Sequence, residues 1–255
     1  GSEMCIRDRD NQLPQHTQDM GKLLAFYTGS LREADRLHRE FEQALGDFEW
    51  QDTQDAMKPV CQQARKAYGR LAEKAQLAFT RHFQAGGWPL AGQLANADVF
   101  DRFVAPKLQQ HGHKVAYLMI DALRYELGVA LEQQLVEDGA VALQAALAPL
   151  PTITPVGMAA LLPGAGQQLS LRRDDKTLVP MLGDQPVANV AQRMEVLRKR
   201  YGQRFAEGRL EAYVRGRLDI PDDADLLVLR AVEIDSHFEN HPDTAPAEIT
   251  NALRR

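Results

Sequence analysis

The sequence predicts an α/β protein in which a mostly parallel sheet flanked by helices follows an α-helical N-terminal region. Residues 115–120 and 226–232 indicate the sheet, because both are short, uninterrupted apolar runs that lead into acidic residues. Such runs are typical of strands buried on both faces. The helical region is indicated by residues 13–84, where apolar side chains recur at three- and four-residue steps.

The N-terminal region is predicted to contain two long helices and one shorter helix. Residues 23–45 and 56–83 carry the helical pattern, and residues 46–53 connect them. Two glycines and a proline within residues 86–89 end the second helix, because neither residue type continues a helix at low cost. A third helix is predicted over residues 98–111. We assign no chemistry to this region.

Strands and helices alternate from residue 114 onward. This order is typical of a parallel sheet whose ligand site lies at the carboxyl ends of its strands. In chain order, we expect a strand at 115–120, a helix at 123–137, a strand at 141–147, a short helix at 156–162, a loop-rich segment at 164–186, a helix at 187–205 and a strand at 226–232.

The composition is that of a globular protein, with 44% apolar and 25% charged residues and a net charge of −5. The two cysteines, Cys5 and Cys61, are too few for a disulfide scaffold or a cysteine-rich zinc site, and they fit a reducing cytoplasm. No apolar run approaches the ~20 residues that a membrane helix needs. We therefore expect a cytoplasmic protein that does not contact a membrane.

The densest basic stretch spans residues 193–204, which include five Arg or Lys residues. Val190, Met194 and Leu197 recur at helical spacing in the same segment. The pattern predicts an amphipathic helix with a solvated basic face. It leaves direct nucleic-acid binding undecided.

The first ten residues differ in character from the rest of the chain. The segment MCIRDR is similar to translated adapter sequence in assembled metagenomic reads. We therefore expect residues 1–10 to be a non-native leader. Residues 11–112 then form the helical N-terminal region, and residues 113–255 form the domain that contains the sheet.

Asp121 is the first candidate site residue, because it directly follows the predicted strand at 115–120. A carboxylate at the end of a buried strand costs stability unless it is paired or bound to a metal. Asp is also a favoured N-cap residue. Asp121 therefore has a second interpretation as the cap of the helix that begins at Leu123.

Thr152 and Thr154 lie in a Pro-Thr-Ile-Thr-Pro turn that precedes a predicted helix. A hydroxyl at a helix N-terminus commonly serves as a cap. It can also serve as a nucleophile, because free N–H groups and a nearby metal favour the alkoxide. Both interpretations stay open on the sequence.

Five potential oxygen or imidazole ligands follow the last predicted strand within nine residues, namely Glu233, Asp235, His237, Glu239 and His241. Carboxylate combined with imidazole suits zinc or manganese, whereas a set of oxygen ligands alone suits magnesium. A polar surface loop is the alternative interpretation of this segment.

Three segments, taken in this order, resemble PglZ domains of the alkaline phosphatase superfamily. They are MIDALRYE at 119–126, LPTITPVGMAALLPG at 150–164 and VEID at 232–235. The resemblance covers roughly residue 114 to the end of the chain. It implies an alkaline-phosphatase-like fold, in which Thr154 corresponds to the nucleophile, with Thr152 as the alternative.

The resemblance also implies roles for the remaining candidates. Asp121 corresponds to a ligand of one metal ion and Asp235 to a ligand of a neighbouring ion, with Glu239, His237 or His241 assisting. Glu239 stands where superfamily relatives place a histidine. A further candidate, Arg124, either contacts a phosphoryl oxygen or forms a salt bridge with a neighbouring acidic residue.

The function implied by the resemblance is that of a metal-dependent phosphoesterase in a bacterial anti-phage (BREX, or phage growth limitation) defence system. Two divalent ions, zinc or manganese with magnesium as a further option, would support an in-line displacement by the threonine. The implied partners are a DNA methyltransferase and an ATPase, and the substrate is a phosphate ester. The alternative is a non-catalytic scaffold that assembles a defence complex through the helical region.

One superfamily motif has no counterpart in this sequence. The superfamily pattern includes a later strand ending in Asp-His-Gly, and no Asp-His pair occurs in the chain. We therefore expect a fragment truncated at both ends, which lacks the C-terminal part of the fold. Weak metal binding and little turnover are expected from it.

Overall fold

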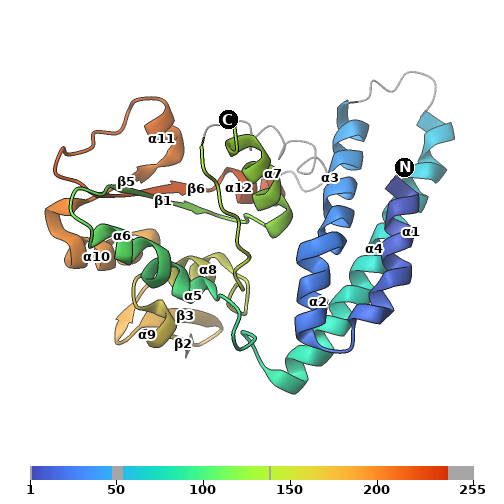
Figure 1. The fold of residues 1–255 in the computed structure, drawn as a ribbon, viewed down its shortest axis with the longest axis horizontal. Coiled ribbons are helices and arrows are strands. Elements are labelled where there is room, and N and C mark those ends of the chain that lie inside the picture. The colour runs from blue at the N-terminus through green and yellow to red at the C-terminus, as the bar shows by residue number, and fades with distance from the viewer. Residues whose placement is uncertain (1, 48–53, 138, 241–255) are drawn as a thin grey trace. The chain divides into compact units, whose positions relative to one another are not determined.

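A computed structural model describes residues 2–47, 54–137 and 139–240 (Figure 1). The described chain divides into two compact units. The helical unit contains the described residues of 1–90, 123–145 and 234–255. The sheet unit contains residues 91–122 and 146–233. The predicted combination of a helical N-terminal region and an α/β fold is confirmed.

The N-terminal part of the helical unit is almost entirely helical. Its elements are α1 (Ser2–Gln12), η1 (Leu13–His16), α2 (Met20–Phe26), η2 (Tyr27–Leu31), α3 (Arg32–Asp47) and α4 (Gln54–Gly86). The two long predicted helices are confirmed, because α2, η2 and α3 follow one another without a break and α4 covers the second pattern. Most of the predicted connection at 46–53 lies outside the described residues.

Apolar side chains from α2, η2, α3 and α4 form the core of the helical unit. Leu23, Phe26 and Leu31 pack in one cluster with Leu71 and Ala78 of α4. The exposed fractions of these residues are all below a tenth, so the periodic positions of the sequence are the buried positions. The expected leader segment also contributes, since Ile6 of α1 belongs to the same cluster.

A buried ion pair joins α3 to α7 (Tyr125–Leu135) within the helical unit. The Arg39 guanidinium donates from Nε and Nη2 to the Glu126 carboxylate, with N–O distances of 3.1–3.3 Å. The side chains of Arg39 and Glu126 are only 7% and 2% exposed. α12 (Glu233–Asn240) also belongs to this unit from Ile234 onward.

The main sheet of the second unit has three parallel strands in the order β1 (Val115–Ile120), β6 (Leu226–Ala231) and β5 (Phe205–Arg209), as Figure 1 shows. The predicted strands at 115–120 and 226–232 are confirmed, and they are direct neighbours. Their register pairs Ile120 with Ala231, so their carboxyl ends are aligned.

The sheet unit also contains helices, several of which pack on this sheet. They are α5 (Asn96–Val99), η3 (Phe100–Val104), α6 (Ala105–Leu108), α8 (Thr154–Ala160), α9 (Ala165–Gln168), α10 (Val190–Tyr201), η4 (Gly202–Arg204) and α11 (Leu210–Val214). One core cluster combines Leu226 and Val228 of β6 with Phe100, Ala159 and Met194 from η3, α8 and α10. A Phe100 ring also meets the ring of Tyr117 edge to face.

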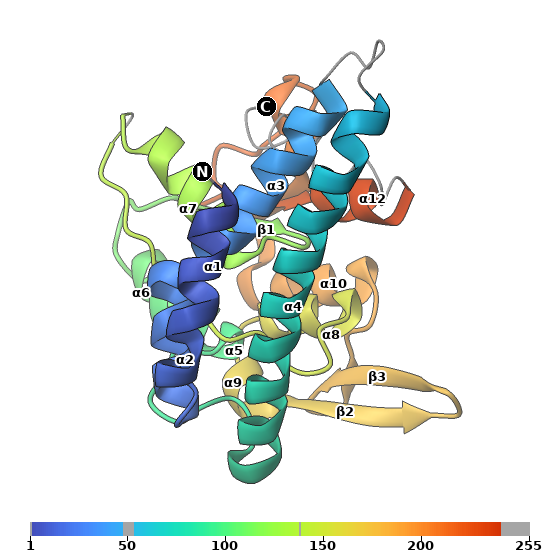
Figure 2. The ribbon, with the colours of Figure 1, turned by 90° about the vertical axis from the view of Figure 1, so that its right-hand side faces the viewer.

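Two secondary-structure predictions are wrong. Residues 141–147 form no strand, and only an isolated bridge pairs Leu147 with Ala95, because no neighbouring strand offers a ladder to the rest of the segment. The expected loop at 164–186 instead contains an antiparallel sheet of β2 (Leu169–Asp174), β3 (Thr177–Leu182) and β4 (Gln185–Pro186), whose hairpin is visible in Figure 2.

Candidate functional site

Asp121 directly follows β1, and it is 9% exposed. Its backbone N–H donates to the carbonyl oxygen of Ala231 over 2.9 Å, which extends the pairing of β1 with β6 by one residue. Its Oδ1 accepts the N–H of Ala122 over 3.0 Å. The N-cap of α7 is Arg124, so the interpretation of Asp121 as the cap of that helix is wrong.

Ala122 turns the chain sharply after Asp121. Its φ angle is +57°, in the left-handed region that residues with a Cβ adopt only at a cost. Strained backbone of this kind persists where the surrounding structure holds it, and it concentrates at functional sites. The turn fixes the position of the Asp121 carboxylate at the edge of the sheet.

Thr152 and Thr154 are both exposed, and neither caps a helix. Thr154 is the first residue of α8, whose N-cap is Ile153 and has no side-chain hydrogen bond. The capping interpretation of the two threonines is therefore wrong. The Thr154 hydroxyl is left accessible, which is the arrangement that a nucleophile requires.

The segment after β6 is a helix, and the interpretation of it as a surface loop is wrong. Asp235 and His237 are half-buried and Glu239 is exposed, whereas His241 lies outside the described residues. Residues four apart share one face of a helix, while residues two apart do not. α12 therefore presents Asp235 and Glu239 on one face, and His237 on another.

Arg124 lies close to polar side chains of α3 and α4 in the helical unit. Burial lowers the pKa of His38, and the charges of Arg65 and Arg124 lower it further, whereas Glu42 and Asp35 raise it. The His38 ring stacks on the Tyr68 ring with 3.9 Å between centroids. This polar group was not anticipated from the sequence, because its members lie on three different helices.

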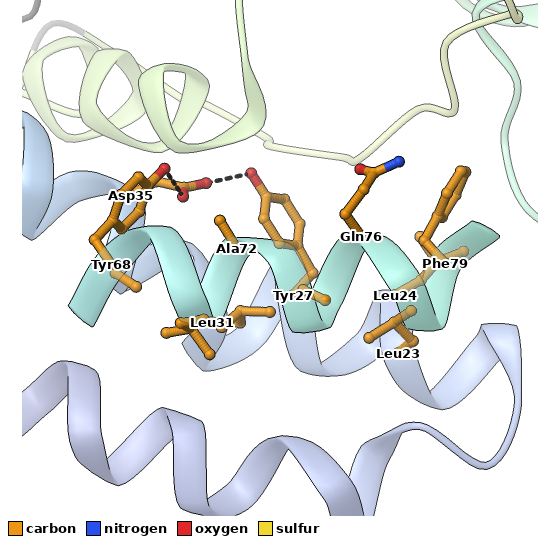
Figure 3. Close-up of a pocket in the computed structure, with 12 residues that line it drawn as sticks. Leu23, Leu24, Tyr27, Leu31, Asp35, Tyr68, Ala72, Gln76 and Phe79 are labelled. Atoms are coloured by element: carbon orange, nitrogen blue, oxygen red, sulfur yellow. Dashed lines mark hydrogen bonds between the residues drawn. The ribbon is translucent and has the colours of Figure 1, made fainter. Parts of the chain in front are cut away.

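A pocket of about 300 Å³ lies beside these residues, between the helices α2, α3 and α4 (Figure 3). Its lining is mostly apolar, and Asp35 is its one carboxylate. The hydroxyls of Tyr27 and Tyr68 donate to the two oxygens of Asp35 over 2.7 and 2.9 Å. Burial and the Asp35 charge raise the pKa of both tyrosines, so their hydroxyls stay protonated. The polar end of the pocket is therefore satisfied internally.

Arg193 is buried in the sheet unit, although the sequence predicted a solvated basic face for this segment. Its exposed fraction is 5%. Burial lowers the pKa of Arg193, while attraction by Asp121 raises it and repulsion by Arg230 lowers it. Asp121 and Arg230 therefore both lie near enough to Arg193 to act on its charge. The remaining basic residues of α10 are exposed, as predicted.

The donor chemistry of the candidate ligands fits a divalent ion, since carboxylates and imidazole are ordinary ligands of zinc, manganese and magnesium. Within residues 2–47, 54–137 and 139–240, however, no group of three or more His, Cys, Asp or Glu side chains forms a metal site. The ligand assignments therefore rest on the type of each residue and on its position in the fold. No helix in these ranges is both long and apolar enough to cross a membrane.

A parallel sheet with helices packed on it, an acidic residue at the aligned strand ends and an accessible threonine at the start of a helix define an alkaline-phosphatase-like α/β domain. Residues 99–238, more than half of the chain, match the family profile described as the BREX system PglZ alkaline phosphatase-like domain. The chain belongs to the PglZ family. A search of curated proteins found no match to it.

Proposed function

We propose that this chain carries the nucleophile and metal ligands of a metal-dependent phosphoesterase that acts in cytoplasmic BREX defence. Family membership supports a phosphoesterase-like domain in such a system. The observation that carries the proposal is the nearly buried Asp121 carboxylate at the aligned ends of β1 and β6. Ligand sites of open α/β sheets lie at this edge.

Thr154 is proposed as the nucleophile. Its hydroxyl oxygen attacks the phosphorus of the ester, a new O–P bond forms, and the bond to the leaving alcohol breaks. Water then cleaves the phosphothreonine, which restores the hydroxyl and releases phosphate from a monoester or a phosphomonoester from a diester. The exposure of Thr154 and its freedom from a capping role support this assignment.

Asp121 and Asp235 are proposed to hold two divalent ions, zinc or manganese, with Glu239 assisting Asp235. The i, i+4 spacing on α12 favours Glu239 over His237 as the helper. His241 is the remaining candidate. When bound, such ions lower the pKa of an attacking hydroxyl and stabilise the leaving oxygen.

The test compares Thr154→Ala with Thr152→Ala in the native gene product that contains this sequence. Hydrolysis of a nitrophenyl phosphodiester and the content of bound zinc and manganese are measured together. We expect Thr154→Ala to abolish hydrolysis with metal content unchanged, and Thr152→Ala to retain activity. Equal activity in all three proteins would refute Thr154 as the nucleophile.

If the wild-type protein binds no metal and hydrolyses no ester, the proposed phosphoesterase function is refuted. That result would leave the non-catalytic scaffold as the function. Family membership implies other defence components as partners. We propose a DNA methyltransferase and an ATPase of the same system, which co-purification with the native protein tests.

A further inference from the structure

Arg193 belongs to α10 and is buried, with an exposed fraction of 5%. α10 packs on the sheet through the core cluster that contains Leu226 and Val228 of β6. The Nη1 group of Arg193 donates to the carbonyl oxygens of Ala188 and Val187, over 2.8 and 3.4 Å. Both acceptors lie just before α10, so these hydrogen bonds hold the guanidinium near the start of the helix.

Arg230 lies on the same face of the sheet. Side chains two residues apart along a strand point to the same side, so Arg230 follows Leu226 and Val228 on the side that α10 covers. Its Nη2 donates to Glu207 over 2.8 Å. Its Nε, in contrast, is buried and has no hydrogen-bond partner in the described part of the chain.

Asp121 completes this group. It stands two residues after Met119, whose side chain belongs to the core on this face. The strand alternation therefore directs Asp121 to the side of Arg193 and Arg230. The electrostatic influence of both Asp121 and Arg230 on Arg193 agrees with this placement.

One donor of this pair of guanidinium groups, the Nε–H of Arg230, is buried without an acceptor among the described residues. Each guanidinium has five N–H donors. Arg193 donates to two carbonyl oxygens through Nη1 alone, and no carboxylate of the described residues forms an ion pair with Arg193. Buried donors without acceptors cost stability. The cluster therefore favours a ligand that brings several negatively charged oxygens.

We propose that Arg193 and Arg230 bind the phosphoryl oxygens of the substrate beside Asp121, an inference that rests on the proposed function. Planar guanidinium groups match the oxygens of a phosphate ester in pairs and keep their charge when buried. Arg124 stays a separate candidate for a phosphoryl contact, and its charge also acts on His38 and Tyr68 of the helical unit.

The test measures binding of inorganic phosphate by calorimetry, and KM and kcat for a nitrophenyl phosphodiester. Arg193→Gln and Arg230→Gln are compared with Arg200→Gln, which removes an exposed arginine of α10. We expect phosphate affinity to fall by about 10- to 100-fold in the first two variants, as for a lost hydrogen bond to a charged group. KM should rise in parallel, and Arg200→Gln should change neither the phosphate affinity nor KM.

Circular dichroism checks that each variant is folded. If Arg193→Gln does not fold, Arg193→Lys, which keeps the charge but loses the planar set of donors, and Arg230→Gln decide. Folded variants with unchanged phosphate affinity overturn the inference, and the proposed enzyme stands if Thr154→Ala still abolishes hydrolysis. Phosphate binding that depends on Arg193 in a protein without hydrolysis supports the anion site and refutes the enzyme.

Discussion

The buried pair of Arg39 and Glu126 allows a quantitative prediction about the stability of the helical unit. At an N–O distance of 3.1 Å, an effective dielectric constant of about 20 gives a Coulomb attraction of about 5 kcal/mol. Transfer of each ion from water costs several kcal/mol, so the intact pair contributes little net stability. Removal of one partner leaves the other charge buried, which typically costs about 3–5 kcal/mol.

We therefore expect Glu126→Gln and Arg39→Met each to lower the free energy of unfolding by about 3–5 kcal/mol. The double variant Arg39→Met/Glu126→Leu should recover most of this loss, because apolar side chains of similar volume replace the pair. Urea unfolding followed by circular dichroism at the helix band gives these values. The difference between single and double variants gives the coupling energy.

The control is the pair of Arg36 and Glu40 on the same helix, whose side chains are 35% and 47% exposed. Removal of its charges should change stability by less than about 1 kcal/mol, as for other solvent-exposed ion pairs. If Glu126→Gln lowers the free energy of unfolding by no more than this control does, the pair of Arg39 and Glu126 is solvated. The assignment of Glu126 as the residue that fastens α7 to α3 would then be refuted.

Three further predictions concern single positions. The lowered pKa of His38 favours its neutral form in the folded state, so its contribution to stability is present above pH 6.5 and is lost as pH falls below that value. The urea midpoint should therefore depend less on pH below 6.5 in His38→Phe than in the wild type. Ala122→Gly should be neutral or stabilising by up to about 1 kcal/mol in thermal unfolding, because it relieves left-handed strain, and Ala122→Val should destabilise. Asn189→Ala removes the capping box of α10 and should cost about 1 kcal/mol by the same assay, with a surface Asn11→Ala as the control.

The sheet could be predicted where the strands are buried and their sequences are therefore apolar throughout. Residues 115–120 and 226–231 are apolar throughout, and both are strands of the parallel sheet. β5 was missed, since its sequence Phe-Ala-Glu-Gly-Arg has the composition of a loop. Pairing with β6 makes it a strand, and Glu207 is held there by Arg198 and Arg230. Tertiary contacts of this kind outweigh local propensity.

The candidate site was predictable only in part. The position of Asp121 follows from the end of an apolar run, and that prediction is confirmed by its place after β1. The burial of Arg193 was missed because its charge placed it with the basic neighbours, although its spacing of three residues from Val190 and four from Leu197 puts it on the apolar face of the helix. Only the carbonyl oxygens of Val187 and Ala188 and the sheet beneath α10 explain why this one guanidinium is buried.

The segment Asp121–Glu126 shows how residues next to one another in a motif take separate roles. Asp121 stands at the edge of the sheet, under the influence of Arg193. Arg124 acts on the polar side chains of the helical unit, and Glu126 is committed to Arg39. The strained turn at Ala122 separates the first role from the other two. The motif therefore combines Asp121 at the edge of the sheet with Glu126, whose buried ion pair builds the fold, and contacts, more than proximity in sequence, distinguish them.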